Sequence, residues 1–273
     1  MAIYDVNGLI IPTGGGGGGG TEEVARERLS GKILIALGDS YTAGMRSQLS
    51  ALASRYNMII DNRGVVSATI SYRNTTPNKR MFNIADTIVT DYTSGKTIDG
   101  TTYYTDDVAI ITFMGGANDG SIISSWIGTG IQETDKTTIY GSLNHIFNVF
   151  RETFTKSEII CITQPSNYAI LKSSVSTDAG AQELGFTDLA ELQVMSDVQF
   201  SNYCHAIKEE AVKAITWPYG VKVVDMYYEF PSILNPSNRA NYWQNDKLHL
   251  TTAGYNLIAN ALNYKIIELF GQT

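Results

Sequence analysis

Short apolar runs alternate with amphipathic helical segments along most of this chain, and this alternation constrains the fold more than any other feature. Near-continuous apolar strands that alternate with helices are typical of a parallel sheet covered on both faces. We therefore predict an α/β fold with a five-stranded parallel sheet. The expected strands lie at 32–37, 58–60, 108–113, 159–162 and 221–224. The expected helices have apolar residues at helical spacing over Met45–Tyr56, Leu143–Phe154, Phe200–Ile215 and Ile258–Leu269.

Two stretches interrupt the alternation: residues 66–106, which are polar and rich in Thr and Tyr, and residues 164–198. Both follow strand ends at the edge where open parallel sheets bind ligands, so we expect insertions within one domain spanning 21–273. Residues 1–13 are predicted to form a strand or hairpin, and the glycine run 14–20 a flexible linker. This tethered apolar segment suggests docking onto an assembly partner, such as a phage-type particle.

Composition narrows the function classes. The 273 residues carry 20 basic and 27 acidic side chains, a net charge of −7, without a cluster of Lys or Arg. Binding to nucleic acid is therefore not expected. The chain shows no secretory signal and no apolar stretch long enough for a membrane span, which leaves the localisation open between the cytoplasm and a phage-type particle. With two cysteines and no Cys/His cluster, we expect neither a metal site nor a cofactor.

A candidate nucleophile lies between the first predicted strand and the helix after it. Residues 38–42 read Gly-Asp-Ser-Tyr-Thr, which places Ser40 in the strand-to-helix turn. Unsatisfied N–H groups and the positive end of the helix dipole favour a developing anion there. The alternative is that Ser40 only caps the helix, a role that Asp39 fits equally well. Taken alone, the motif favours the capping role.

The three histidines are not equivalent candidates for a base. His145 faces away from the apolar stripe of its helix and is expected to be solvated, and His205 flanks an apolar helix face. His249 lies in a polar loop before a helix, three residues after Asp246. A neutral imidazole can accept the proton of Ser40 at one nitrogen and donate to a carboxylate from the other, which fixes its tautomer. The alternative for Asp246 and His249 is an ordinary hydrogen bond within a loop.

An ester hydrolase also needs donors for the oxyanion, each contributing on the order of 3 kcal/mol. Asn118, in the string Gly-Ala-Asn-Asp at 116–119, follows the third strand and offers a side-chain amide. The backbone N–H groups of Gly64 and Ser40 are further candidates, although ordinary turn chemistry would also explain the glycine. All these elements follow strand ends or precede a helix at one edge of the predicted sheet. Together they therefore indicate a catalytic site more strongly than each motif does alone.

These strings resemble the SGNH (GDSL-type) hydrolase family. Residues 38–40 are similar to its nucleophile block, Gly64 to its second block, 116–119 to its third and 246–249 to its fifth. The resemblance covers roughly residues 31–271. It implies a flavodoxin-like three-layer α/β/α sandwich without a metal, and ester hydrolysis through an acyl-enzyme. By the same resemblance, Ser40, His249 and Asp246 form the catalytic triad. Tyr41 stands where the family's name has Leu.

The substrate is less constrained. Among the 16 tyrosines and 3 tryptophans, the candidates for substrate contact are Tyr41, Tyr72 and Trp243, since aromatic rings with polar tips suit sugar faces. No long apolar lid segment is visible. We expect a serine esterase that acts on a small acyl ester, acetyl, on a carbohydrate. The alternatives are a lipase or thioesterase for longer acyl chains, and a non-catalytic glycan-binding or structural component of a phage-like assembly.

Overall fold

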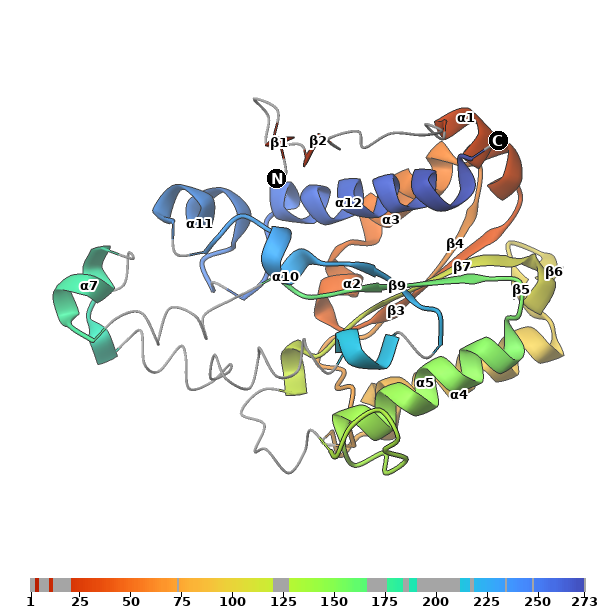
Figure 1. The fold of residues 1–273 in the computed structure, drawn as a ribbon, viewed down its shortest axis with the longest axis horizontal. Helices are drawn as coiled ribbons and strands as arrows, with labels where there is room; N and C mark the ends of the chain where they lie inside the picture. The colour runs from red at the N-terminus through yellow and green to blue at the C-terminus, as the bar shows by residue number, and fades with distance from the viewer. Residues whose placement is uncertain are drawn as a thin grey trace.

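A five-stranded parallel sheet forms the centre of the computed structural model (Figure 1). The structure describes residues 3–4, 10–11, 21–72, 74–119, 128–165, 176–183, 187–190, 212–216, 219–233, 235–246 and 248–272. The strands, in their order across the sheet, are β4 (Ile59–Gly64), β3 (Ile33–Gly38), β7 (Val108–Met114), β8 (Glu158–Ile162) and β9 (Lys222–Val224). This confirms the predicted sheet, and the order is that of flavodoxin-like folds.

The central strand β3 shows why both faces of the sheet are covered. All its residues are buried, and successive side chains point to opposite faces. Leu34 and Ala36 belong to the core under one helical layer, whereas Ile33, Ile35 and Leu37 belong to the core under the other. The first layer contains α1 (Glu22–Leu29), α3 (Arg46–Arg55) and α12 (Thr252–Phe270), and the second α4 (Met81–Ser94) and α5 (Ile139–Thr153). The three-layer sandwich is therefore confirmed (Figure 1).

The stretch 66–106 does not interrupt the alternation as expected, because it supplies helix α4. One face of α4 is buried and apolar at helical spacing: Met81, Phe82, Ile84, Ala85, Ile88 and Tyr92. Thr and Asp residues on the rest of the helix obscure this pattern in the sequence. Before α4 comes a short 3-10 helix, Pro77–Lys79. After it, β5 (Lys96–Ile98) and β6 (Thr101–Tyr103) form an antiparallel hairpin, followed by a 3-10 turn at Thr105–Asp107.

The N-terminal part contains one expected and one unexpected element. β1 (Ile3–Tyr4) and β2 (Ile10–Ile11) pair antiparallel, which agrees with the predicted hairpin. The glycine run 14–20 lies outside the described residues. Helix α1, which the sequence did not suggest, packs along α12, and the Thr21 N–H beside it donates to the Gly271 carbonyl at 2.9 Å.

Two expectations lie largely outside the described residues. Of the stretch 164–198, the structure describes 164–165, 176–183 with α7 (Asp178–Glu183), and 187–190. Of the expected helix 200–215, it describes 212–215, which are helical. The short helices α10 (Met226–Glu229) and α11 (Pro236–Tyr242) connect β9 to α12. Within the described ranges, no helix combines the length and apolar character needed to cross a bilayer.

Candidate active site

Ser40 is the first residue of helix α2 (Ser40–Gly44), directly beyond the carboxyl end of β3. The helix cap is Asp39, whose Oδ1 accepts the Tyr41 N–H at 2.9 Å. The Ser40 hydroxyl is therefore not needed for capping. Gly38 makes the turn possible, because a Cβ at this position would lie 2.2 Å from the Met114 carbonyl oxygen. The sequence had left the choice between Ser40 and Asp39 open, and the structure assigns the cap to Asp39.

His249 lies in the loop before α12, and its two ring nitrogens have different partners. Nε2 is 3.1 Å from Ser40 Oγ, and Nδ1 is 2.6 Å from Asp246 Oδ2. A neutral imidazole protonated on Nδ1 donates to the carboxylate and accepts the hydroxyl proton at Nε2. The structure thus brings Ser40, His249 and Asp246 together in the order that proton transfer from a serine requires.

The carboxylate of Asp246 is held by the backbone of its own loop. Its Oδ1 accepts the N–H groups of Leu248 at 3.0 Å and of His249 at 2.9 Å. Partial burial by itself would raise the pKa of Asp246, but the hydrogen bonds from the ring and backbone of His249 and from Leu248 lower it below the ordinary value. Asp246 therefore stays ionised and keeps the His249 ring oriented.

Tyr41 and Trp243 were expected to contact substrate, but both are buried and support the His249 loop instead. The Tyr41 hydroxyl donates to the Leu248 carbonyl at 2.5 Å, and its ring centroid lies 6.3 Å from that of His249. Trp243 is 3% exposed and forms an isolated β-bridge with Leu250. The expectation is wrong for both residues, because neither presents a surface that a ligand could touch.

Tyr72, the third aromatic candidate, is 48% exposed. Its ring stacks on Phe82 with an interplanar angle of 13°, and the guanidinium carbon of Arg80 lies 3.5 Å from its centroid. Tyr72 is not part of the described lining of the cleft beside Ser40. Its contact with substrate stays a prediction.

Gly64 ends β4 directly opposite the end of β3. A Cβ at Gly64 would lie 2.4 Å from the Ala43 nitrogen, so glycine allows β4 to approach helix α2 closely. The Gly64 N–H donates to Asn62 Oδ1 at 2.9 Å, and Asn62 Nδ2 donates to the Thr42 carbonyl at 3.3 Å. The sequence placed Gly64 at this edge, but it did not show that its N–H already has an acceptor.

Asn118 lies in a short 3-10 turn, Ala117–Asp119, beyond the end of β7. One of its side-chain N–H groups donates to the Ala68 carbonyl at 3.0 Å, which fixes the amide. The second N–H of the same nitrogen can donate to a ligand. The Ser40 N–H, at the start of α2, is likewise not used within the helix.

Two buried carboxylates beneath the site have anchoring contacts that the sequence did not predict. Asp39 is fully buried, and its Oδ2 accepts the Ala117 N–H at 3.2 Å and Gln164 Nε2 at 2.8 Å. One side chain therefore ties together the ends of β3, β7 and β8. Gln164 carries no signal in the sequence, and its buried Oε1 has no hydrogen-bond partner within the described part of the chain.

Asp119 performs a similar role for the segment after β4. It is fully buried and accepts the Ile70 N–H at 2.8 Å and both the N–H and the hydroxyl of Ser71, at 3.0 and 2.8 Å. Asp39 and Asp119 both lie inside the motifs that drew attention to the site. Their partners are distant in the sequence, so the motifs alone did not reveal these anchoring roles.

The pair of Ser40 and His249 opens into a cleft of about 500 Å³. Its described lining contains no Asp, Glu, Lys or Arg, and Val66 is its large exposed apolar side chain, at 60%. Burial raises the pKa of Tyr255 to about 12, so that this hydroxyl stays protonated at neutral pH. The lining residues are Ser40, Ala43, Gly44, Ser47, Gln48, Val66, Gln244, His249, Leu250, Thr252 and Tyr255. The cleft therefore combines polar and apolar surface and, in its described lining, has no carboxylate, ammonium or guanidinium group.

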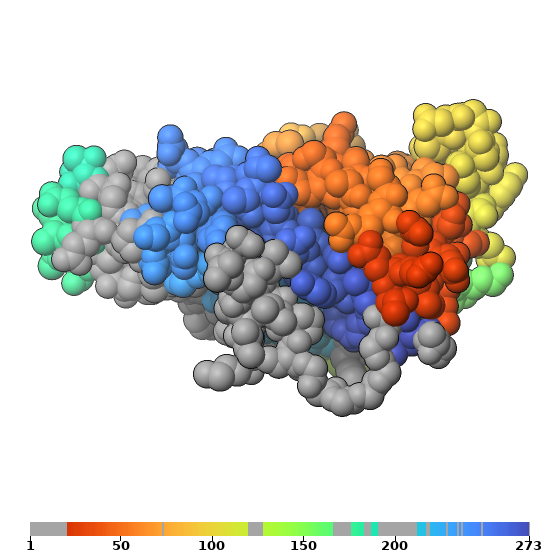
Figure 2. Space-filling model, turned by 90° about the horizontal axis from the view of Figure 1, so that it is seen from above, coloured from red at the N-terminus to blue at the C-terminus, as the bar shows by residue number. Residues whose placement is uncertain are grey.

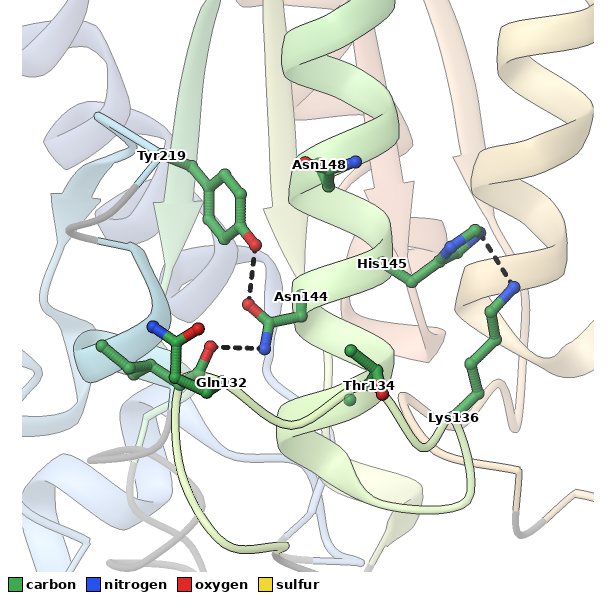
Figure 3. Close-up of a pocket in the computed structure, with 9 residues that line it drawn as sticks. Gln132, Thr134, Lys136, Asn144, His145, Asn148 and Tyr219 are labelled. Atoms are coloured by element: carbon green, nitrogen blue, oxygen red, sulfur yellow. Dashed lines mark hydrogen bonds between the residues drawn. The ribbon is translucent and has the colours of Figure 1, made fainter.

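The other histidines do not join this site. His145 was expected to be solvated, but its side chain is 22% exposed, and Nε2 lies 2.6 Å from Asp86 Oδ1 and 3.2 Å from Lys136 Nζ. It lines a separate pocket of about 350 Å³ beside α5 (Figure 3). His205 lies outside the described residues. In the part of the chain that the structure describes, no group of three or more His, Cys, Asp or Glu side chains could hold a metal ion.

Solved structures share the fold of this chain. Among solved structures, the chain is similar to a protein from Lactobacillus plantarum, with 21% identity, a TM-score of 0.63 and coverage of 89% of this chain and 99% of that one. It is also similar to a possible lipase from Chitinophaga pinensis, with 18% identity, a TM-score of 0.51 and coverage of 87% and 98%. At these identities the likeness shows the fold alone. No curated protein matched the chain.

The family comparison is more specific. Residues 36–257 match the GDSL-like Lipase/Acylhydrolase family, a span that includes Ser40, Gly64, Asn118 and the Asp246–His249 loop. The match covers most of the chain, and it contains every segment that meets at the carboxyl edge of the sheet. This chain therefore belongs to the GDSL-like Lipase/Acylhydrolase family and is a hydrolase.

Proposed function

We propose that this hydrolase is a serine esterase that removes a small acyl group, acetyl, from a carbohydrate. The observation that carries the proposal is the continuous contact from Ser40 Oγ to His249 Nε2, at 3.1 Å, and from His249 Nδ1 to Asp246, at 2.6 Å. A serine hydroxyl within such a chain can lose its proton as it attacks a carbonyl carbon.

In the proposed ester hydrolysis, Nε2 of His249 accepts and returns protons while Nδ1 stays bonded to Asp246. Ser40 Oγ attacks the acyl carbon while Nε2 takes the hydroxyl proton, and the imidazolium then returns that proton to the sugar oxygen as its bond to the acyl carbon breaks. Water then attacks the acyl carbon and loses a proton to Nε2, and the imidazolium returns that proton to Ser40 Oγ as the bond between Oγ and the acyl carbon breaks and the acid leaves. Asp246 stabilises the imidazolium in both steps and does not itself take the proton.

The developing oxyanion needs donors at the end of the sheet. The Ser40 N–H and the second N–H of Asn118 fulfil this role, each contributing on the order of 3 kcal/mol to transition-state stabilisation. The Gly64 N–H is a third donor, shared with Asn62, whose Oδ1 accepts it at 2.9 Å. We expect Gly64 to contribute less than the other two, because the oxyanion must compete with this amide oxygen.

The character of the cleft supports a small acyl group on a polar acceptor. The side chains of Ser47, Gln48, Gln244 and Thr252 offer donors and acceptors that suit hydroxyl groups. A long acyl chain would require a continuous apolar surface, and Val66 supplies only a short one. The polar lining therefore favours an acetylated carbohydrate over the lipase and thioesterase alternatives.

The decisive experiment compares hydrolysis of p-nitrophenyl acetate, butyrate, octanoate and laurate by the native protein, Ser40→Ala and Ser54→Ala. Ser54 is an exposed serine of α3 outside the cleft, so its variant is the matched control. We expect the highest rate on acetate and a loss of about 10⁵-fold or more in kcat for Ser40→Ala. Equal rates for the native protein and Ser40→Ala would sink the catalytic proposal.

The same panel separates the alternatives. A preference for octanoate or laurate would favour a lipase or thioesterase over an acetyl esterase. Acetate release from acetylated xylan then tests the carbohydrate acceptor, since an enzyme restricted to small soluble esters would leave that polymer intact.

A further inference from the structure

A second hollow continues from the catalytic cleft along the surface between α3 and α12. It measures about 200 Å³ and shares one residue, Gln48, with the cleft beside Ser40. The two helices contact each other and lie side by side when the molecule is seen from above (Figure 2). The hollow is lined by Gln48, Ala51, Leu52, Arg55, Asn256, Ala259, Asn260 and Asn263. A molecule bound at Ser40 can therefore extend onto this surface.

The polar groups of the hollow are mostly amides. Its one charged lining residue, Arg55, already lies 3.6 Å from the Glu22 carboxylate. No acidic side chain lines it among the described residues. The described lining therefore offers a charged ligand only a cation that is already paired with Glu22. Side-chain amides both donate and accept hydrogen bonds, as sugar hydroxyls do, so the surface suits a neutral, polyhydroxylated ligand.

Three of the four amides are placed to contact such a ligand. Gln48 Nε2 donates to Asn256 Oδ1 at 3.2 Å, which orients both side chains and leaves the Asn256 NH₂ group to donate elsewhere. Asn260 is partly exposed and has no hydrogen-bond partner among the described residues. Asn263 differs, because it is 9% exposed and its Oδ1 accepts the Tyr56 hydroxyl at 2.7 Å. We therefore exclude Asn263, whose role is structural.

The sequence of α12 makes these amides unexpected on structural grounds. Asparagine is a weaker helix former than alanine or the long straight-chain residues. Asn256 and Asn260 nevertheless lie one turn apart, about 6 Å along the same face of the helix. Among the described residues, Asn256 bonds to Gln48 and Asn260 has no hydrogen-bond partner, so pairing within the protein does not account for asparagine at both positions. A ligand that needs both an acceptor and a donor at each position would account for it.

We propose that Gln48, Asn256 and Asn260, together called the amide groove, bind the sugar units of a neutral oligosaccharide that extends beyond the ester at Ser40. The inference rests on the proposed function and deepens it, because it makes the acceptor an oligomer or polymer. The scissile acyl group lies in the cleft at Ser40, and the neighbouring sugars lie along α3 and α12.

Direct binding tests the groove without requiring turnover. Calorimetric titrations would use the unesterified hexasaccharides xylohexaose, cellohexaose and chitohexaose as probes. The proteins are Ser40→Ala alone and Ser40→Ala combined with Asn256→Ala and Asn260→Ala. We expect at least one probe to bind, and the groove substitutions to weaken that binding by tenfold or more. A probe that binds both proteins equally, or the failure of all three probes to bind, would overturn the proposal.

Kinetics provide the second measurement. For a protein that keeps Ser40, kcat/KM is measured on acetylated xylo-oligosaccharides and on p-nitrophenyl acetate, and the first value is divided by the second. We expect this ratio to be about tenfold lower for Asn256→Ala/Asn260→Ala than for the native protein. The matched control is Asn148→Ala, an exposed asparagine of α5 that donates to Glu152 at 2.9 Å on the opposite layer. An unchanged ratio with full esterase activity rejects the groove and leaves the esterase intact. Oligosaccharide binding in a protein without esterase activity would reject the esterase alone.

Discussion

Two histidines of this protein each lie 2.6 Å from a carboxylate, yet only one of them contacts a serine hydroxyl. His249 uses its two nitrogens separately, Nδ1 for Asp246 and Nε2 for Ser40. His145 has its carboxylate, Asp86, on Nε2. The first arrangement can take the Ser40 proton at Nε2 while Nδ1 stays hydrogen-bonded to Asp246, because one nitrogen accepts and the other donates. The second is a contact between a histidine of α5 and a carboxylate of α4 that involves one ring nitrogen.

The surroundings of His145 reinforce this difference. Lys136 Nζ lies 3.2 Å from the same Nε2 that contacts Asp86, and Nδ1 has no partner among the described residues (Figure 3). If Nε2 carries the proton donated to Asp86, the ammonium of Lys136 cannot also donate to it. A short distance between a histidine and a carboxylate is thus not enough to indicate catalysis. The partner of the second nitrogen decides it.

The largest expected effect comes from removing each histidine in turn. His249→Ala should lower kcat on p-nitrophenyl acetate by on the order of 10⁵-fold, because the serine loses its base. His145→Ala should leave kcat within about twofold of the native value, since His145 lines a separate pocket and does not line the cleft beside Ser40. Circular dichroism would confirm that both variants are folded. A comparable loss of kcat in both would show that the comparison between the two histidines is wrong.

The carboxylates sharpen the comparison further. Asp246→Asn should lower kcat by about 10²- to 10⁴-fold, because the amide no longer holds His249 in the tautomer that accepts at Nε2. Asp86→Asn, the same chemical change beside the other histidine, should have no such effect. Steady-state kinetics on one ester would measure both, and activity retained by Asp246→Asn would contradict an orienting role for this carboxylate.

The pH dependence of stability follows from the same carboxylate. The pKa of Asp246 is lowered in the folded state, so its contribution to stability is complete above its ordinary value of 3.8 and is lost as pH falls through the lower folded value. The native protein should therefore unfold at a higher temperature than Asp246→Asn at pH 7. This difference should be greatest above the ordinary pKa of 3.8 and shrink as the pH falls below it. Thermal unfolding followed by circular dichroism measures it.

The smallest effect is expected at Tyr41, which holds the base loop through one hydrogen bond. Tyr41→Phe removes the hydroxyl that donates to the Leu248 carbonyl and keeps the ring. We expect kcat to fall by about five- to tenfold with an unchanged KM, consistent with the loss of one buried hydrogen bond that positions His249. The matched control is Tyr92→Phe. Tyr92 is also buried, and its hydroxyl donates to Asp61 at 3.2 Å in a part of the molecule outside the active site. If both variants changed only stability, Tyr41 would have no positioning role.

Several features were visible in the sequence because they depend on neighbours along the chain. The apolar runs predicted the strands, and Asp246 and His249 lie three residues apart, so their contact could be anticipated. Helix α4 was not predicted. Thr and Asp residues on its outer face make the segment polar overall, and this hides the apolar residues at helical spacing on its inner face. Burial against the sheet, rather than intrinsic propensity, makes this segment a helix.

The sequence by itself determined that a parallel sheet forms and that Ser40, Gly64, Asn118 and His249 lie towards one edge of it, because the carboxyl ends of parallel strands meet at the same edge. Only the tertiary structure decided the rest. It showed that Tyr41 and Trp243 are buried and that the Gly64 N–H has an acceptor. It also joined Ser40 to His249 across 209 positions of sequence. Such contacts form when distant segments pack together, and local periodicity carries no information about which side chains will then meet.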